Sequence, residues 1–240
     1  MTDVLYVIAK APRVGLAKTR LGASIGNEEA IELYKAFLRD LGARFEDAPF
    51  DFGWYVTPDD AWPEISGLTG DTERLLYQGE GDLTDRQREL FREAARRGER
   101  AVLIGSDAPH LKMETIEEAF RALDDHDLVF LPTHDGGYCL IGMSGPHDKV
   151  LEGVKMSTGS EFDGVIRRAK LSSLSVRLLE STFDVDEVED LHNLKQEIIG
   201  RDDLEATREA LEKLGLLDQE SFENGRKHPA FGPKRKDIAP

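Results

Sequence analysis

The chain has 240 residues, of which 40% are hydrophobic and 8% aromatic, which suits one globular domain with a substantial core. Asp and Glu number 47 against 31 Lys and Arg, and the resulting net charge of −16 would repel nucleic acid. This acidity fits either adaptation to high salt or an ordinary acidic protein. No apolar run approaches the ~20 residues that span a bilayer, and the N-terminus lacks a signal-peptide pattern. We therefore expect a cytoplasmic protein without a membrane span.

Short apolar runs bounded by turn residues predict strands along the whole chain. The expected strands cover residues 4–9, 52–56, 74–78, 101–105, 128–131, 138–143 and 174–179. Apolar residues at helical spacing predict helices between these strands. The expected helices cover residues 28–46, 84–97, 114–124, 145–154 and 160–170, one that begins near residue 187, and 203–214.

Several local features complete this prediction. Asn27 and Thr84 are the expected N-caps of the first two helices, and residues 57–73 are rich in turn formers. The single cysteine, Cys139, excludes an internal disulfide and is expected to be a small buried hydrophobe. Strands that alternate with helices indicate an α/β fold, with a mostly parallel sheet between two helical layers. We expect one domain over residues 1–217 and a polar C-terminal tail over 218–240.

Two apolar runs end abruptly in small, acidic, turn-forming clusters. Residues 101–111 read AVLIGSDAPHL, and residues 128–142 read LVFLPTHDGGYCLIG. Asp107 therefore follows one strand, and Asp135 follows another just before Gly136 and Gly137. Open α/β sheets collect ligands at the carboxyl ends of their strands, and carboxylates suit Mg²⁺ or Mn²⁺. Each cluster taken alone is equally consistent with an ordinary surface turn.

The segment after the first strand is locally basic in an acidic chain. Residues 10–26 read KAPRVGLAKTRLGASIG, with Gly15 among the basic residues Lys10, Arg13, Lys18 and Arg20. Such a loop is suited to clamping a di- or triphosphate, and a solvated basic loop is the alternative. It fits neither the P-loop pattern nor the dinucleotide-binding glycine pattern.

Three stretches, AKAPRVGLAKTRL, GSDAPHL and HDGGYCLIGM, together carry a family resemblance. Over about residues 4–200 the chain resembles a GT-A-fold, glycosyltransferase-like family, formerly a domain of unknown function, in the nucleotide-diphospho-sugar transferase superfamily. AKTRL also resembles 2-phospholactate guanylyltransferases, but DGGY before an apolar strand favours the glycosyltransferase-like group. The resemblance implies a GT-A (Rossmann-like) fold with three α/β/α layers. It places Asp107 on a divalent metal and assigns the phosphate loop to Lys10, Arg13, Gly15, Lys18 and Arg20.

Further stretches extend the resemblance. FDVDEVEDL, residues 183–191, resembles the segment that closes related sites with a second metal ligand, here Asp186, with Asp184 as the next candidate. Val188 replaces the usual proline, and on its own the segment also reads as an acidic helix N-terminus. Asp82 lies in a stretch that resembles the family's Gly-Asp-Leu loop beside the nucleotide.

Other polar residues have two interpretations. Ser157 and Thr158 suit either acceptor binding or helix capping, and Met156 precedes them where the family often has tryptophan. His110 and His134 each lie near a candidate site aspartate, so each is either a general base or a loop histidine.

The expected function is that of a Mg²⁺- or Mn²⁺-dependent transferase with Asp107 and Asp135 as catalytic residues. Its donor would be a nucleotide sugar or nucleoside triphosphate and its acceptor a small molecule, with Gly136 and Gly137 near the nucleotide. Glycosyl transfer is the favoured reaction. Nucleotidyl transfer with release of pyrophosphate is one alternative, and non-catalytic binding of a nucleotide sugar is another.

Overall fold

The computed structural model describes residues 1–154, 159 and 161–217. These residues form a seven-stranded sheet in the order β3-β2-β1-β4-β6-β5-β7. The strands are β1 (Thr2–Lys10), β2 (Asp51–Thr57), β3 (Leu75–Tyr77), β4 (Glu99–Gly105), β5 (Leu128–Pro132), β6 (Tyr138–Met143) and β7 (Val176–Leu178). Strand β6 runs antiparallel to both β4 and β5, and the other strand pairs are parallel.

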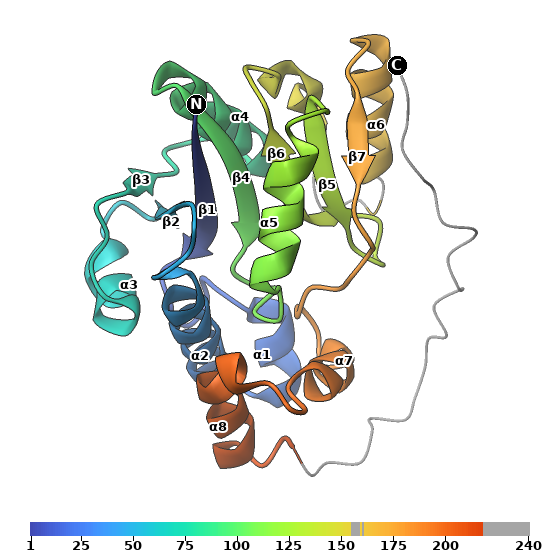
Figure 1. Ribbon diagram of the computed structural model, residues 1–240. Coiled ribbons are helices and arrows are strands. Elements are labelled where there is room, and N and C mark those ends of the chain that lie inside the picture. The colour runs from blue at the N-terminus through green and yellow to red at the C-terminus, as the bar shows by residue number, and fades with distance from the viewer. Residues whose placement is uncertain (155–158, 160, 218–240) are drawn as a thin grey trace.

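Helices cover both faces of this sheet (Figure 1). They are α1 (Thr19–Ile25), α2 (Asn27–Phe45), α3 (Trp62–Thr69), α4 (Leu83–Arg96), α5 (Met113–Ala122), α6 (Glu161–Leu171), α7 (Asp190–Glu197) and α8 (Glu205–Lys213), with 3-10 turns η1 (Asp148–Leu151) and η2 (Asp202–Leu204). Alternate residues of β1 face opposite layers, as the two-residue period of a strand requires. Leu5 and Val7 join the core formed with α2, α5, α7 and α8, whereas Val4 and Tyr6 join the core formed with α4 and α6. The expected three-layer α/β/α fold is confirmed.

Some local predictions are wrong. The turn-rich stretch 57–73 contains α3, where Pro63 occupies the first helical turn, a position that proline tolerates well. The basic segment is partly helical, because α1 begins at Thr19. Asn27 is the first residue of α2 and Gly26 is the cap, so the predicted N-cap is displaced by one residue.

The N-cap of α4 is also different from the prediction. Thr84 is buried and donates to the carbonyl oxygen of Val154 at 2.7 Å, so it does not cap the helix. Asp82 is the cap and accepts from the amide of Asp85 at 3.0 Å. Cys139, by contrast, is 6% exposed, which confirms it as a buried residue.

The parallel strands direct their carboxyl ends to one edge of the sheet. The segments after β1, β4, β5 and β7 all leave from this edge, and the segment after β5 is the short turn into β6. This is the edge at which α/β sheets bind ligands. Among the described residues, no helix combines the length and apolarity that crossing a membrane requires.

Candidate active site

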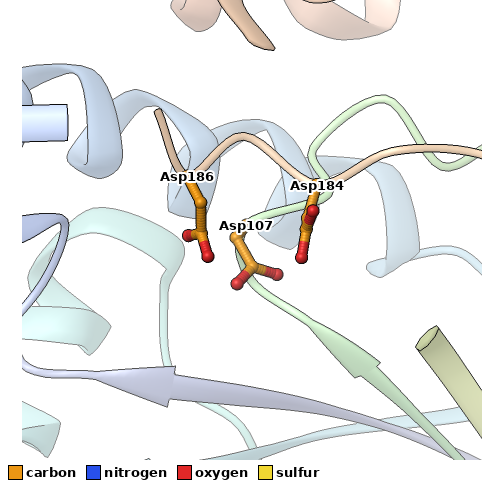
Figure 2. Close-up of side chains that lie close together, drawn as sticks. All are labelled: Asp107, Asp184 and Asp186. Carbon is orange, nitrogen blue, oxygen red and sulfur yellow. The ribbon is translucent and has the colours of Figure 1, made fainter. Parts of the chain in front are cut away.

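Three aspartates meet at this edge (Figure 2). Asp107 lies just after β4, whereas Asp184 and Asp186 lie on the segment between β7 and α7. One carboxylate oxygen from each residue lies within 4.8 Å of the others. Three convergent carboxylates provide the oxygen ligands that Mg²⁺ and Mn²⁺ prefer. The cluster therefore fits a divalent ion.

The fold around the cluster explains how the three side chains converge. Val185 is fully buried between Asp184 and Asp186, so the two flanking side chains remain at the cavity, where both line its wall. The amide of Val185 donates to the carbonyl oxygen of Asp107 at 2.9 Å, which joins the two segments. A Cβ at Gly105 would lie 2.2 Å from Oδ1 of Asp107, so only glycine leaves room there for this carboxylate. Asp184 was predicted only as the second candidate for this ligand, and a role for Gly105 was not predicted.

The cluster is electrostatically unfavourable without a cation. Burial, and after it the charges of Asp107, Asp135 and Asp186, together raise the pKa of Asp184 to about 8. Burial also raises the pKa of Asp107, while nearby Lys18 opposes that change. Like charges held together in a partly dry site favour either a proton or a bound cation. The arrangement suits a metal centre better than a solvated turn.

Lys18 and Arg20 lie directly beside the aspartates. The Lys18 side chain is 5% exposed, and its Nζ lies 2.8 Å from the carbonyl oxygen of Val185, 3.3 Å from Asp186 and 3.9 Å from Asp107. Lys18 itself has a left-handed backbone, with φ of 49°. Arg20 forms an ion pair with Asp186 and lies 3.6 Å from Glu187. Two of the four predicted basic residues are thus beside the carboxylates.

The other residues of the predicted phosphate loop are arranged differently. Arg13 forms ion pairs with Asp60 at 3.0 Å and with Glu64 at 2.5 Å, so a phosphate would have to compete with both carboxylates. Lys10 is exposed at the end of β1, where its amide donates to the hydroxyl of Tyr34. Gly15 has φ of 81° and no atom near a would-be Cβ. It therefore provides a turn conformation that favours glycine.

The β5–β6 turn presents Asp135 to the same cavity. Its Oδ1 accepts from the hydroxyl of Thr133 at 2.5 Å and from the amide of Gly137 at 3.0 Å. Gly136 has φ of 94°, and a Cβ there would lie 2.3 Å from the carbonyl oxygen of Gly159. The turn thus requires glycine at position 136 and holds one oxygen of Asp135 in place.

A cavity of about 320 Å³ connects these parts. Its apolar wall includes Ile8, Leu103, Ile104 and Ile141. Its acidic wall consists of Asp107, Asp135, Glu161, Asp184 and Asp186, and Arg20 is the only cation among the described lining residues. Glu161, at the start of α6, was not predicted, because an isolated Glu at a helix N-terminus carries no distinct signal.

The remaining candidates take different positions. His110 is 5% exposed and stacks on Phe183, and burial lowers its pKa to about 3, which makes it a poor general base. His134 is exposed next to Asp135. Asp82 caps α4, and its neighbour Leu83 lines the cavity. Met156, Ser157 and Thr158 lie outside the described residues.

Known proteins resemble the chain in sequence and fold. Residues 43–158 match a family described as uncharacterized proteins conserved in bacteria (DUF2064). A protein from Desulfovibrio desulfuricans G20, provisionally described as a nucleotide-diphospho-sugar transferase, is 26% identical with a TM-score of 0.81. That match covers 92% of this chain and 100% of the other. The family resemblance seen in the three motifs is confirmed.

More distant structures share the fold alone. A cytidylyltransferase from Leptospira borgpetersenii serovar Hardjo-bovis is 13% identical, with a TM-score of 0.55 and coverage of 93% of this chain and 100% of that chain. A 4-diphosphocytidyl-2C-methyl-D-erythritol synthase from Anaerococcus prevotii DSM 20548 is 13% identical, with a TM-score of 0.51 and coverage of 80% and 94%. No curated protein matches the chain.

Proposed function

We propose that the protein is a divalent-metal-dependent transferase that uses a nucleotide-activated donor, and that the transferred group is a sugar. The observation that carries this proposal is the convergence of Asp107, Asp184 and Asp186 beside Lys18 and Arg20 at one cavity. Carboxylates that bind a cation next to side chains that bind phosphate suit a nucleoside diphosphate leaving group. The similarity to the D. desulfuricans protein supports the same donor class.

Each group has a distinct role in this proposal. Asp107, Asp184 and Asp186 would hold Mg²⁺ or Mn²⁺, which when bound supplies positive charge for the diphosphate. Arg20 is the more accessible cation, with 61% of its side chain exposed, so it would pair with a phosphate oxygen. Lys18 is fixed behind the carboxylates and would add a point charge there. The leaving group would then depart into a positive field that is already in place.

Asp135 supports transfer to a hydroxyl. Its Oδ1 is occupied by Thr133 and Gly137, whereas Oδ2 makes no hydrogen bond with the described residues. A carboxylate with one oxygen held and one open can orient an acceptor hydroxyl or take its proton. Glu161 adds a second carboxylate to this wall of the cavity. Both carboxylates lie beside Gly137, since a Cβ on that residue would lie 3.3 Å from Asp135 and 3.6 Å from Glu161. An acceptor phosphate would meet repulsion there.

Nucleotidyl transfer is the second candidate, and the number of carboxylates favours it. Three aspartates are enough to share two divalent ions, an arrangement that in-line displacement at phosphorus uses. The released product distinguishes the two reactions. The protein should be incubated with Mn²⁺ and a panel of nucleotide sugars and nucleoside triphosphates, and the products resolved by ³¹P NMR. Glycosyl transfer releases a nucleoside diphosphate, nucleotidyl transfer releases pyrophosphate, and binding without release indicates a non-catalytic binding protein.

A further inference from the structure

The two segments that supply the aspartates also contact each other behind the cavity. His110 follows Asp107 by three residues, and Thr182 and Phe183 immediately precede Asp184. The rings of His110 and Phe183 are parallel within 1°, with centroids 4.0 Å apart. Nε2 of His110 lies 2.8 Å from Oγ1 of Thr182, which is hydrogen-bond distance. Side chains thus join the segments in addition to the backbone bond from Val185 to Asp107.

Two arginines whose side chains are only 4% and 11% exposed, Arg44 and Arg201, fix the Asp107 side of this contact. Nη1 of Arg44 donates to the carbonyl oxygens of Pro109 and Leu111 at 2.5 and 2.9 Å. Nη1 of Arg201 donates to the carbonyl oxygen between them, that of His110, at 2.6 Å. Three successive carbonyl groups are therefore held by guanidinium groups from outside the loop. The backbone around His110 is therefore held in place by these hydrogen bonds.

The Asp184 side is fixed to the sheet only up to Thr182. The amide of Thr182 donates to the carbonyl oxygen of Pro132 at 2.9 Å, and its own carbonyl oxygen accepts from His134 at 3.1 Å. Beyond the bridge between Thr133 and Thr182 the segment leaves the sheet and brings Asp184 and Asp186 close to Asp107. The three negative charges repel one another. The contact of Thr182 and Phe183 with His110 is the first one beyond the sheet that holds this segment against the Asp107 loop.

Packing alone does not account for a histidine at position 110. The residue is 5% exposed, and its Nδ1 is buried and has no hydrogen-bond partner among the residues that the structure describes. A buried nitrogen without a partner lowers stability, whereas phenylalanine would fill similar space and keep the stack. What the imidazole provides and phenylalanine could not is the hydrogen bond with Thr182.

We propose that His110, Thr182 and Phe183 form a clasp that keeps Asp184 and Asp186 at metal-binding distance from Asp107. His110 is then a positioning residue, and it acts on metal affinity through the two segments rather than through contact with the metal. The proposal rests on the metal site of the proposed function. Loss of such supporting contacts typically weakens metal binding by about 10- to 100-fold.

The test is Mn²⁺ binding to the full-length protein, followed by electron paramagnetic resonance, together with thermal melting of the metal-free protein. His110→Phe keeps the stack and removes the hydrogen bond, and Thr182→Val removes the same bond from the other side. Both should weaken Mn²⁺ binding by about 10- to 100-fold without lowering the melting temperature in proportion. Thr182→Ser retains the hydroxyl and should restore the affinity.

Phe183→Leu tests the stack, and Phe50→Leu is its control, because Phe50 contacts Phe45 and Phe120 away from the aspartates. The control should change melting only. Unchanged Mn²⁺ affinity in His110→Phe and in Thr182→Val would overturn the clasp. If the unmodified protein binds no Mn²⁺, the metal site of the proposed function fails first. The two failures are therefore distinguishable.

Discussion

The ammonium group of Lys18 donates a hydrogen bond of 2.8 Å to the carbonyl oxygen of Val185, 167 positions away in the chain. Val185 separates Asp184 from Asp186, so the bond ties the basic segment after β1 to the acidic segment after β7. The rings of Tyr34 and Phe37 lie 5.8 and 6.0 Å from the same ammonium group. Lys18 is therefore a structural cation as well as a candidate phosphate ligand.

This relationship separates the roles of the two cations. Arg20→Ala removes an exposed guanidinium, so it should weaken binding of a nucleoside diphosphate by about tenfold and leave nucleoside binding unchanged. Lys18→Met should weaken the same binding and also lower the melting temperature, because the carbonyl oxygen of Val185 loses its buried partner. Calorimetry with both ligands and thermal melting give the comparison. Equal loss of nucleoside binding in Arg20→Ala would indicate that the substitution disrupts α1 and the site as a whole.

The glycine turn between β5 and β6 gives a steric prediction. Gly136→Val should severely reduce turnover, because its Cβ would lie 2.3 Å from the carbonyl oxygen of Gly159 and its φ of 94° is strained for valine. Gly200→Val is the matched control, since Gly200 has φ of 71° but no atom near its would-be Cβ. The control should lose about 1–2 kcal/mol of stability and keep its activity. Equal activities of the two variants would show that the glycine at position 136 is not required for turnover.

Asp135 is predicted to act on the acceptor rather than the donor. Asp135→Asn keeps the size and one hydrogen-bonding oxygen, so donor affinity should change less than twofold, whereas turnover should fall by about 10²- to 10⁴-fold if the carboxylate takes the proton. Donor binding is measured by calorimetry, and turnover by release of the nucleoside diphosphate. Normal turnover would reduce Asp135 to a turn residue and direct attention to exposed His134.

Asp184 predicts a pH dependence of metal binding. Burial, and then the charges of Asp107, Asp135 and Asp186, raise its pKa to about 8, so a metal must displace its proton at neutral pH. Mg²⁺ affinity should therefore rise between about pH 6 and 8 and level off above. In the metal-free protein the same raised pKa has the opposite effect. Its stability should fall between about pH 4 and pH 8 and level off above, because over this range the folded state keeps a proton that the unfolded chain has already released.

Calorimetry across this pH range, with Asp184→Asn for comparison, measures both effects. The variant should bind Mg²⁺ more weakly, and its affinity should depend less on pH. A flat profile for the unmodified protein would show that Asp184 is already ionised or does not bind the metal.

The fold was predictable because most strands carry a continuous apolar run and the long helices have apolar residues at regular spacing. Leu5 and Val7 pack on one layer and Val4 and Tyr6 on the other, and a sheet covered on both faces produces this continuous run. Helix α3 was missed because a short helix with proline in its first turn resembles a loop in composition. The cap of α4 was misplaced because Asp82 and Thr84 are both good capping residues, and burial of Thr84 decides between them.

The site was predictable where a residue follows a strand, as Asp107 and Asp135 do. Asp186 was predicted from the resemblance, with Asp184 as the second candidate, but the approach of both to Asp107 depends on Val185 being buried between them. The pairing of Arg13 with Asp60 and Glu64 could not be predicted, because Glu64 lies on α3, which was not predicted, and Asp60 lies in the turn just before it. The clasp at His110 depends on a contact between residues more than seventy positions apart.

The most direct measurement of the central claim is nucleoside diphosphate binding by calorimetry, with and without Mn²⁺, in the unmodified protein and in Asp107→Ala. Asp107 lies on a loop with 34% of its side chain exposed, so its removal should leave the fold intact, and circular dichroism checks this. Mn²⁺ should strengthen binding to the unmodified protein and have no effect on the variant. Metal-dependent affinity that survives in Asp107→Ala would contradict a metal centre on these three aspartates.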